Sequence, residues 1–190
     1  MKLFAPVRTA IAAAALAFGA ALPASAAFYV DDTTGGPTFN RALAGFSDLS
    51  SVGTDVAYDV YAFSVAVDGL YSIRSFAEGL LAGEPWDQFL FLYAGSFDPT
   101  APLLNGVIGN DDYDSTIGRS GFDVDLTTGT AYYLVTTGFG NDDSGRFLNV
   151  VRGPGDILPV VPEPGTYAML AMGLFAVSLA VRRRALGQPD

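Results

Sequence analysis

The densest group of oxygen-bearing side chains lies at residues 109–114. Asn110, Asp111, Asp112 and Asp114 place four hard oxygen donors within five positions, after an apolar stretch. Calcium ions in proteins take about six to eight oxygen ligands, several of them carboxylates. A Ca²⁺ site at these four side chains is therefore one hypothesis. A turn in which Asn and Asp bind their own backbone is the alternative.

This loop lacks the glycine and the final glutamate of an EF-hand, so a ligand must come from elsewhere in the fold. Asp87 or Asp123, each beside an apolar stretch, could supply it. The similar residues 140–145 are predicted to form a hairpin loop, with a second cation site as the alternative.

The single tryptophan, Trp86, stands next to Asp87 and two residues after Glu84. An indole ring can stack on the apolar face of a sugar while carboxylates accept its hydroxyl protons. Trp86 is therefore a candidate ligand-binding residue. The alternative is that the ring closes one end of a hydrophobic core.

The chain has no histidine and no cysteine. Catalysis by a Ser-His-Asp triad, by a Cys-His pair or by His-ligated zinc is thereby excluded. We predict no catalytic residue and a non-enzymatic protein. The alternative is a secreted carboxylate-dependent hydrolase of matrix polysaccharide, which needs two acids ~5–9.5 Å apart. With so many acids, one such pair arises by chance.

Residues 27–160 carry five arginines against 18 acidic side chains, a net charge of −13. Nucleic-acid binding requires a basic surface, so this class of function is excluded. Cations, neutral sugars and other proteins are the partners that the charge favours.

The N-terminus has the three parts of a secretory signal peptide. Lys2 and Arg8 are followed by an apolar run over 11–22 and by Ala24-Ser25-Ala26. We predict cleavage after Ala26 and assign residues 1–26 to the signal peptide, a retained anchor being the alternative.

The C-terminus combines a proline-rich break, an apolar run and three arginines. Residues 158–165 form a predicted linker that contains Val161-Pro162-Glu163-Pro164, and residues 166–181 form a predicted transmembrane helix. The helix would span roughly 24 Å, which is shorter than the ~30 Å hydrocarbon core. Residues 182–190 form the remaining tail, which contains Arg182, Arg183 and Arg184. These positive charges predict that the tail lies in the cytoplasm.

This arrangement over 161–188 resembles the PEP-CTERM sorting signal of Gram-negative bacteria. The resemblance implies that an exosortase recognises the Pro-Glu-Pro segment and removes the tail. Signal peptidase and exosortase are then the partners during export. The protein would be anchored transiently in the inner membrane and would pass to the cell surface or an extracellular matrix.

The region between the two signals shows a periodicity of two, which is typical of half-buried strands. The Asp68-Gly69 pair predicts a hairpin between two of them. The expected fold is an all-β antiparallel sandwich or jelly roll over 27–157. Its expected strands are 28–31, 58–67, 70–77, 87–93, 103–108, 121–126, 131–137 and 146–151.

The strand patterns over 55–152, with Asn110-Asp111-Asp112 between them, are similar to the bacterial pre-peptidase C-terminal (PPC) domain. The resemblance implies a secreted jelly-roll module, some of whose relatives bind collagen or calcium. Taken together, the sequence predicts an exported, non-enzymatic surface or matrix protein that binds exopolysaccharide or protein, with Ca²⁺ as a candidate ion and no cofactor assigned with certainty.

Overall fold

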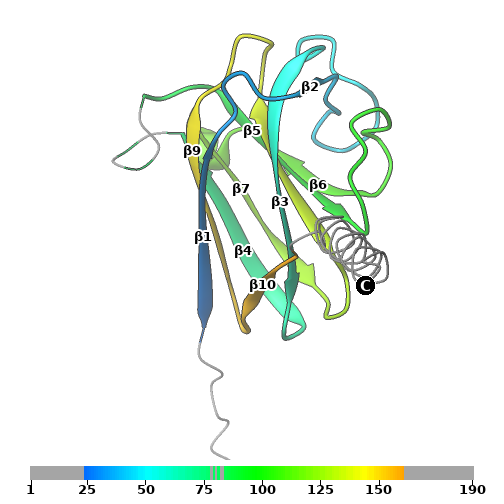
Figure 1. Ribbon diagram of the computed structural model, residues 1–190, viewed down its shortest axis with the longest axis vertical. Coiled ribbons are helices and arrows are strands. Elements are labelled where there is room, and N and C mark those ends of the chain that lie inside the picture. Colours follow the sequence, from blue (N-terminus) through cyan, green and yellow to red (C-terminus); the bar gives the residue numbers. More distant parts are fainter. Residues whose placement is uncertain (1–23, 78, 80, 82–83, 161–190) are drawn as a thin grey trace, which may run out of the picture.

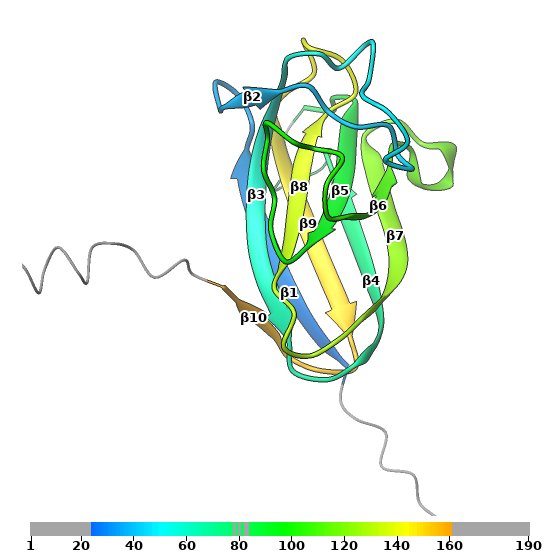
Figure 2. The same ribbon diagram turned by 90° about the vertical axis from the view of Figure 1, so that its right-hand side faces the viewer.

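Two antiparallel β-sheets pack face to face in the computed structural model, which describes residues 24–160 except 78, 80, 82 and 83 (Figures 1 and 2). The four-stranded sheet has the order β1-β9-β4-β7. Its strands are β1 (Ser25–Asp32), β4 (Gly69–Phe76), β7 (Arg119–Leu126) and β9 (Arg146–Gly153).

The six-stranded sheet has the order β10-β3-β8-β5-β6, and β2 also pairs with β3. Its strands are β2 (Thr38–Phe39), β3 (Val56–Val65), β5 (Gln88–Ala94), β6 (Gly106–Asn110), β8 (Tyr132–Gly138) and β10 (Ile157–Pro159). A single-turn 3₁₀ helix, η1 (Tyr113–Ser115), lies between β6 and β7. The predicted all-β sandwich is confirmed.

Alternate side chains of both sheets form the main core. Phe63, Leu92 and Leu134 of the six-stranded sheet pack against Tyr71 and Ile73 of the four-stranded sheet, and all five are fully buried. Period-two patterning produces this layer because every second side chain of a strand points to the same face.

A second core covers the outer face of the six-stranded sheet. Phe46 and Phe97 come from chain segments outside the sheet and contact Phe91 and Tyr93 of β5, and Phe39 of β2 packs against Phe97. Both faces of β5 are therefore buried, which explains its nearly continuous apolar sequence. The prediction of a central strand here is correct.

The predicted strands match observed ones within a few residues, but both predicted hairpins are wrong. Asp68-Gly69 joins β3 to β4, which lie in different sheets, and residues 140–145 join β8 to β9, which also do. Both edges of β3 are already paired, with β8 and with β10. β4 therefore crosses to the other sheet, which packs face to face against the sheet that contains β3. The Asp68 carboxylate accepts a hydrogen bond from the Thr128 N–H (2.6 Å), which ties two such connections together.

The two chain ends leave the sandwich at edge strands. β1 begins at Ser25, two residues before the expected cleavage site. It pairs with β9 along its whole length, from Ser25 opposite Gly153 to Asp32 opposite Arg146. β10 extends to Pro159, and the Val160 N–H donates to the Ala62 carbonyl (2.9 Å). No helix within the described part of the chain has the length and apolar character to cross a membrane. The predicted helix over 166–181 lies outside that part.

Candidate metal centre at one end of the sandwich

Three carboxylates meet where β5 begins and β6 ends. Oxygen atoms of Asp87, Asp111 and Asp112 all lie within 4.8 Å of one another. Asp87 directly precedes β5, and the two others directly follow β6, because the antiparallel register places Asn110 opposite Leu90. Sheet pairing thus brings together acids that are more than twenty positions apart in the sequence.

Each of the three carboxylates has one oxygen that is buried and makes no hydrogen bond in the structure. These are the Oδ1 atoms of Asp87, Asp111 and Asp112. A buried, unsatisfied carboxylate oxygen costs free energy unless a cation or a proton neutralises it. The arrangement is therefore suited to a hard divalent cation, with the remaining ligands coming from water and backbone.

A buried polar network fixes the position of the trio. The Ser120 hydroxyl contacts the Asp111 carbonyl and donates to the Gln88 carbonyl (2.9 Å). The Gln88 amide in turn accepts from the Ser75 hydroxyl (2.9 Å) and donates to the Gly118 carbonyl (3.1 Å). Both sheets are thereby tied together directly beneath the carboxylates, so their spacing does not depend on the loops alone.

The only buried arginine among the described residues, Arg41, lies beside this site. Its guanidinium donates to the Phe139 carbonyl (2.8 and 3.0 Å) and to the Ala42 carbonyl (3.1 Å), and it stacks 4.3 Å from the Phe89 ring centroid. Gly53 makes room for it, because a Cβ there would lie 2.6 Å from the Arg41 Nε. The Phe139 N–H donates to the Asp87 carbonyl (2.9 Å), so Arg41 is connected to the trio through one residue.

The local charge balance stays negative despite Arg41. Burial, together with the neighbouring carboxylates of Asp87 and Asp112, raises the pKa of Asp111 to about 6, while Arg41 acts in the opposite direction. Burial also raises the pKa of Asp87, with Asp143 and Asp112 adding to the effect. The site therefore disfavours three free carboxylates and favours a bound cation or proton.

The structure separates the predicted ligands into two groups. Asp111 and Asp112 belong to the trio, and Asp87 is the additional acid that the sequence suggested. The Asn110 amide oxygen instead accepts from the Gly121 N–H (2.9 Å), and Asp114 is exposed in η1. Asp123 is ion-paired with Arg74 (2.8 Å) on the outer face of the four-stranded sheet.

Other residues singled out from the sequence lie at the same end. Asp143, from the loop predicted as a hairpin, comes near enough to raise the pKa of Asp87, and its own carboxylate accepts from the Gly140 N–H (2.8 Å). The Trp86 indole N–H donates to the Arg146 carbonyl (2.8 Å), and its ring lies against Gly145. Trp86 thus lies against the end of the loop that joins β8 to β9, and its two predicted roles, in ligand binding and in closing one end of the core, stay predictions.

Comparison with known proteins identifies one motif. The model of the PEP-CTERM protein-sorting motif matches residues 160–184, which confirms the predicted sorting signal. The motif implies an exported protein that is processed by an exosortase at a membrane. The likeness to the PPC domain stays a prediction.

No curated protein matches the chain. Among solved structures, a family 35 carbohydrate binding module from an environmental isolate is similar, with 16% sequence identity and a TM-score of 0.36. The match covers 70% of this chain and 98% of that module.

Proposed function

We propose that this chain is a non-enzymatic protein of the surface or extracellular matrix of a Gram-negative bacterium. Its β-sandwich binds exopolysaccharide or a matrix protein, and its acidic end holds Ca²⁺. The sorting motif is the observation that carries the proposal, because it begins at Val160, where the chain is still hydrogen-bonded to β3. The sandwich is therefore the part that sorting delivers to the outside.

The Ca²⁺ component is supported by the trio itself. Three carboxylates within 4.8 Å, each with a buried oxygen that makes no hydrogen bond, form an incomplete hard-oxygen coordination shell. An exported protein without cysteine cannot use disulfides, so a bound ion is one remaining way to stabilise a loop-rich end. We propose Asp87, Asp111 and Asp112 as the ligands, in place of the set with Asn110 and Asp114.

The alternative function, a carboxylate-dependent hydrolase, draws on the same residues. Asp111 has a raised pKa close to other acids, which a general acid also needs. However, the oxygens lie closer than the ~5–9.5 Å separation of glycosidase carboxylates. One oxygen of each carboxylate is also buried, which leaves the trio less accessible to a sugar than the acids of an open cleft. These two facts favour cation binding.

The mature protein is expected to bind the extracellular polysaccharide or matrix protein of its producer without cleaving it. The measurement is co-sedimentation with the isolated matrix, combined with an assay for newly formed reducing ends. The release of reducing ends that is lost in an Asp111→Asn variant would establish the hydrolase instead. An absence of binding to any matrix fraction would remove the binding role.

A further inference from the structure

The basic residues of the sandwich are distributed very unevenly. Residues 27–160 contain five arginines and no lysine. Arg41 is buried at the acidic end, and all of the others belong to strands of the four-stranded sheet, namely Arg74, Arg119, Arg146 and Arg152.

These four arginines share the outer face of that sheet, which we call the arginine face. In the register, Ser72 lies opposite Arg152 and Phe76 lies opposite Arg119, and alternate residues of a strand point to the same side. The residues between them, such as Tyr71 and Ile73, fill the core. The arginines therefore gather on the face of this sheet that points away from the core, whereas the domain as a whole is strongly acidic.

Two arginines on this face differ in their partners. Arg74 is held by Asp123 (2.8 Å), by the Ile73 and Phe122 carbonyls (2.8 and 2.7 Å) and by the Tyr113 hydroxyl (3.1 Å). Arg152 is exposed, and among the described residues we find no hydrogen bond or ion pair of its side chain. Its guanidinium is therefore available to a ligand.

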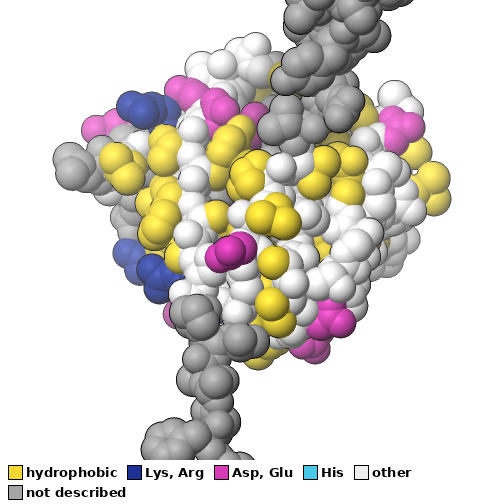
Figure 3. Space-filling model, turned by 60° about the horizontal axis from the view of Figure 1, so that its bottom comes forward, with side chains coloured by type: hydrophobic (Ala, Val, Ile, Leu, Met, Phe, Trp, Pro, Cys, Tyr) yellow, Lys and Arg dark blue, Asp and Glu magenta, His cyan; other side chains and the backbone are white. Residues whose placement is uncertain are grey.

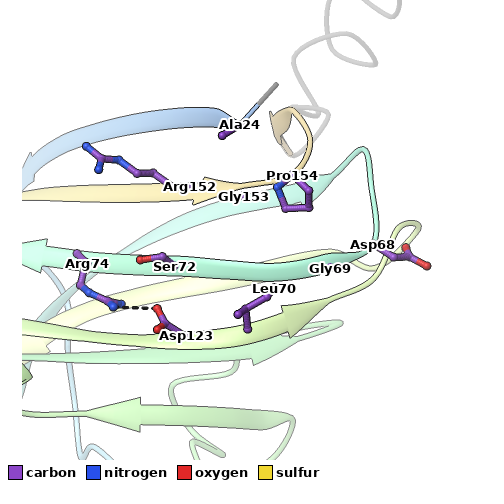
Figure 4. A pocket seen from close by; sticks show the side chains of 10 residues that line it. All are labelled: Ala24, Asp68, Gly69, Leu70, Ser72, Arg74, Asp123, Arg152, Gly153 and Pro154. Carbon is purple, nitrogen blue, oxygen red and sulfur yellow. Dashed lines mark hydrogen bonds and ion pairs between the residues drawn. The ribbon is translucent and has the colours of Figure 1, made fainter. Parts of the chain in front are cut away.

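An open hollow of about 680 Å³ lies between these two side chains, along β4 and β9 (Figure 4). Figure 4 shows Ser72 between Arg152 and the Arg74–Asp123 pair, with Leu70 further along β4. A smaller hollow shares Ser72, Arg74 and Arg152 and continues toward Val150. Ala24 lines the far end of the larger hollow but belongs to the predicted signal peptide, so cleavage would open that end.

Exposed apolar side chains lie on the same face as the hollow. Leu70 is 61% exposed, and Phe28 on β1, which faces Val150 in the register, is 64% exposed. Figure 3 shows basic side chains, all of which are arginines in this domain, next to hydrophobic ones on one side of the molecule. A polymer with both anionic groups and apolar ring faces would match this surface.

We propose that the arginine face binds a polysaccharide that carries carboxylate groups, with Arg152 as the principal contact. The planar guanidinium presents a fork of N–H donors that matches a carboxylate, whereas lysine does not, and this domain has only arginine. An anionic membrane surface is less well matched, because such binding uses dense lysine and arginine clusters without interspersed acids such as Asp123 and Asp125. This inference rests on the proposed function and specifies its ligand class.

The test compares binding of the mature protein to polygalacturonate, an acidic polymer, and to dextran, a neutral one. We expect binding to polygalacturonate that weakens with salt, and little binding to dextran. Arg152→Ala is expected to lower the affinity about tenfold, the usual scale for a lost charged hydrogen bond. Arg152→Lys should restore part of the loss.

Asp125→Asn is the matched control, because it removes a negative charge from the same face. Asp125→Asn should strengthen binding, whereas a substitution that only disturbed the structure would weaken it. Unchanged melting temperatures would show that the variants fold. Equal affinity of wild type and Arg152→Ala, equal binding to dextran, or stronger binding to anionic lipid vesicles would overturn the inference. If Arg152→Ala binds the producer's matrix as wild type does, the proposed function stands and only this face is excluded.

Discussion

Asp111→Asn is expected to abolish the stabilisation of the sandwich by Ca²⁺. A ligand that binds only the folded state stabilises it by about 2.7 kcal/mol at a hundredfold excess over Kd. For a domain of this size, that corresponds to a rise in Tm of about 10 °C. The Asn side chain keeps the shape of Asp111 but removes the charge and one ligand oxygen. The measurement is thermal unfolding with Ca²⁺ and with a chelator.

Asp114→Asn provides the matched control for this experiment. Asp114 lies in the same segment but is exposed and outside the trio, so its variant should keep the full Ca²⁺ response. Asp112→Asn and Asp87→Asn should behave like Asp111→Asn. A wild-type Tm that does not respond to Ca²⁺ would contradict the metal centre. Loss of the Ca²⁺ response in the Asp114→Asn variant would show that the ion is bound by the contiguous loop at residues 110–114 instead.

The pH dependence gives a second readout of the same site. The pKa of Asp111 is raised from 3.8 to about 6, so the folded state binds the proton more tightly than the unfolded state does. This contribution to stability is complete below pH 4 and is lost as the pH rises through 6. The metal-free protein should therefore become less stable over this window. The Ca²⁺ response should grow over the same window, because protons compete for the carboxylates.

Arg41→Met is expected to destabilise the sandwich by about 3–5 kcal/mol. The substitution removes the hydrogen bonds to the Phe139 and Ala42 carbonyls and the stacking on Phe89, and it leaves those carbonyls buried without a donor. It also removes the positive charge that opposes the raised pKa values of Asp87 and Asp111. Urea-induced unfolding at neutral pH measures the loss.

Combining Arg41→Met with Asp111→Asn separates the electrostatic part from the packing part. If Arg41 offsets acid repulsion, the double variant should lose less stability than the sum of the two single variants. Strict additivity would mean that Arg41 acts through packing and hydrogen bonds alone. A loss below about 1 kcal/mol in Arg41→Met, a typical surface value, would contradict its structural role.

The strands were predictable because their signal is local. Alternation of apolar and polar residues identifies a half-buried strand wherever it pairs, and the uninterrupted apolar run of β5 marks a strand buried on both faces. Pairing was not predictable in the same way. Asp-Gly marks a tight turn, but whether the chain returns within one sheet or crosses to the other depends on which edges are already taken. β2 and β10 are only two and three residues long, too short to show a periodicity.

Only part of the candidate metal centre was predictable, because one of its acids is brought in by strand pairing. Asp111 and Asp112 stand out as neighbours in the sequence, while Asp87 joins them only through the β5–β6 register. Asn110 and Asp114 have the right chemistry, but the direction of a side chain in a loop cannot be read from spacing. Arg41 gave no signal at all, because a lone arginine in a loop is ordinarily exposed. Likewise, the arginine face emerges only when the register of three strand pairs is known.

Intact-mass spectrometry of the protein recovered from its producer tests whether the acidic sandwich alone reaches the outside. We expect a species in the extracellular or surface fraction that begins at Ala27 and has lost the arginines after residue 181. A full-length chain of 190 residues, confined to the cytosol with both ends intact, would contradict it.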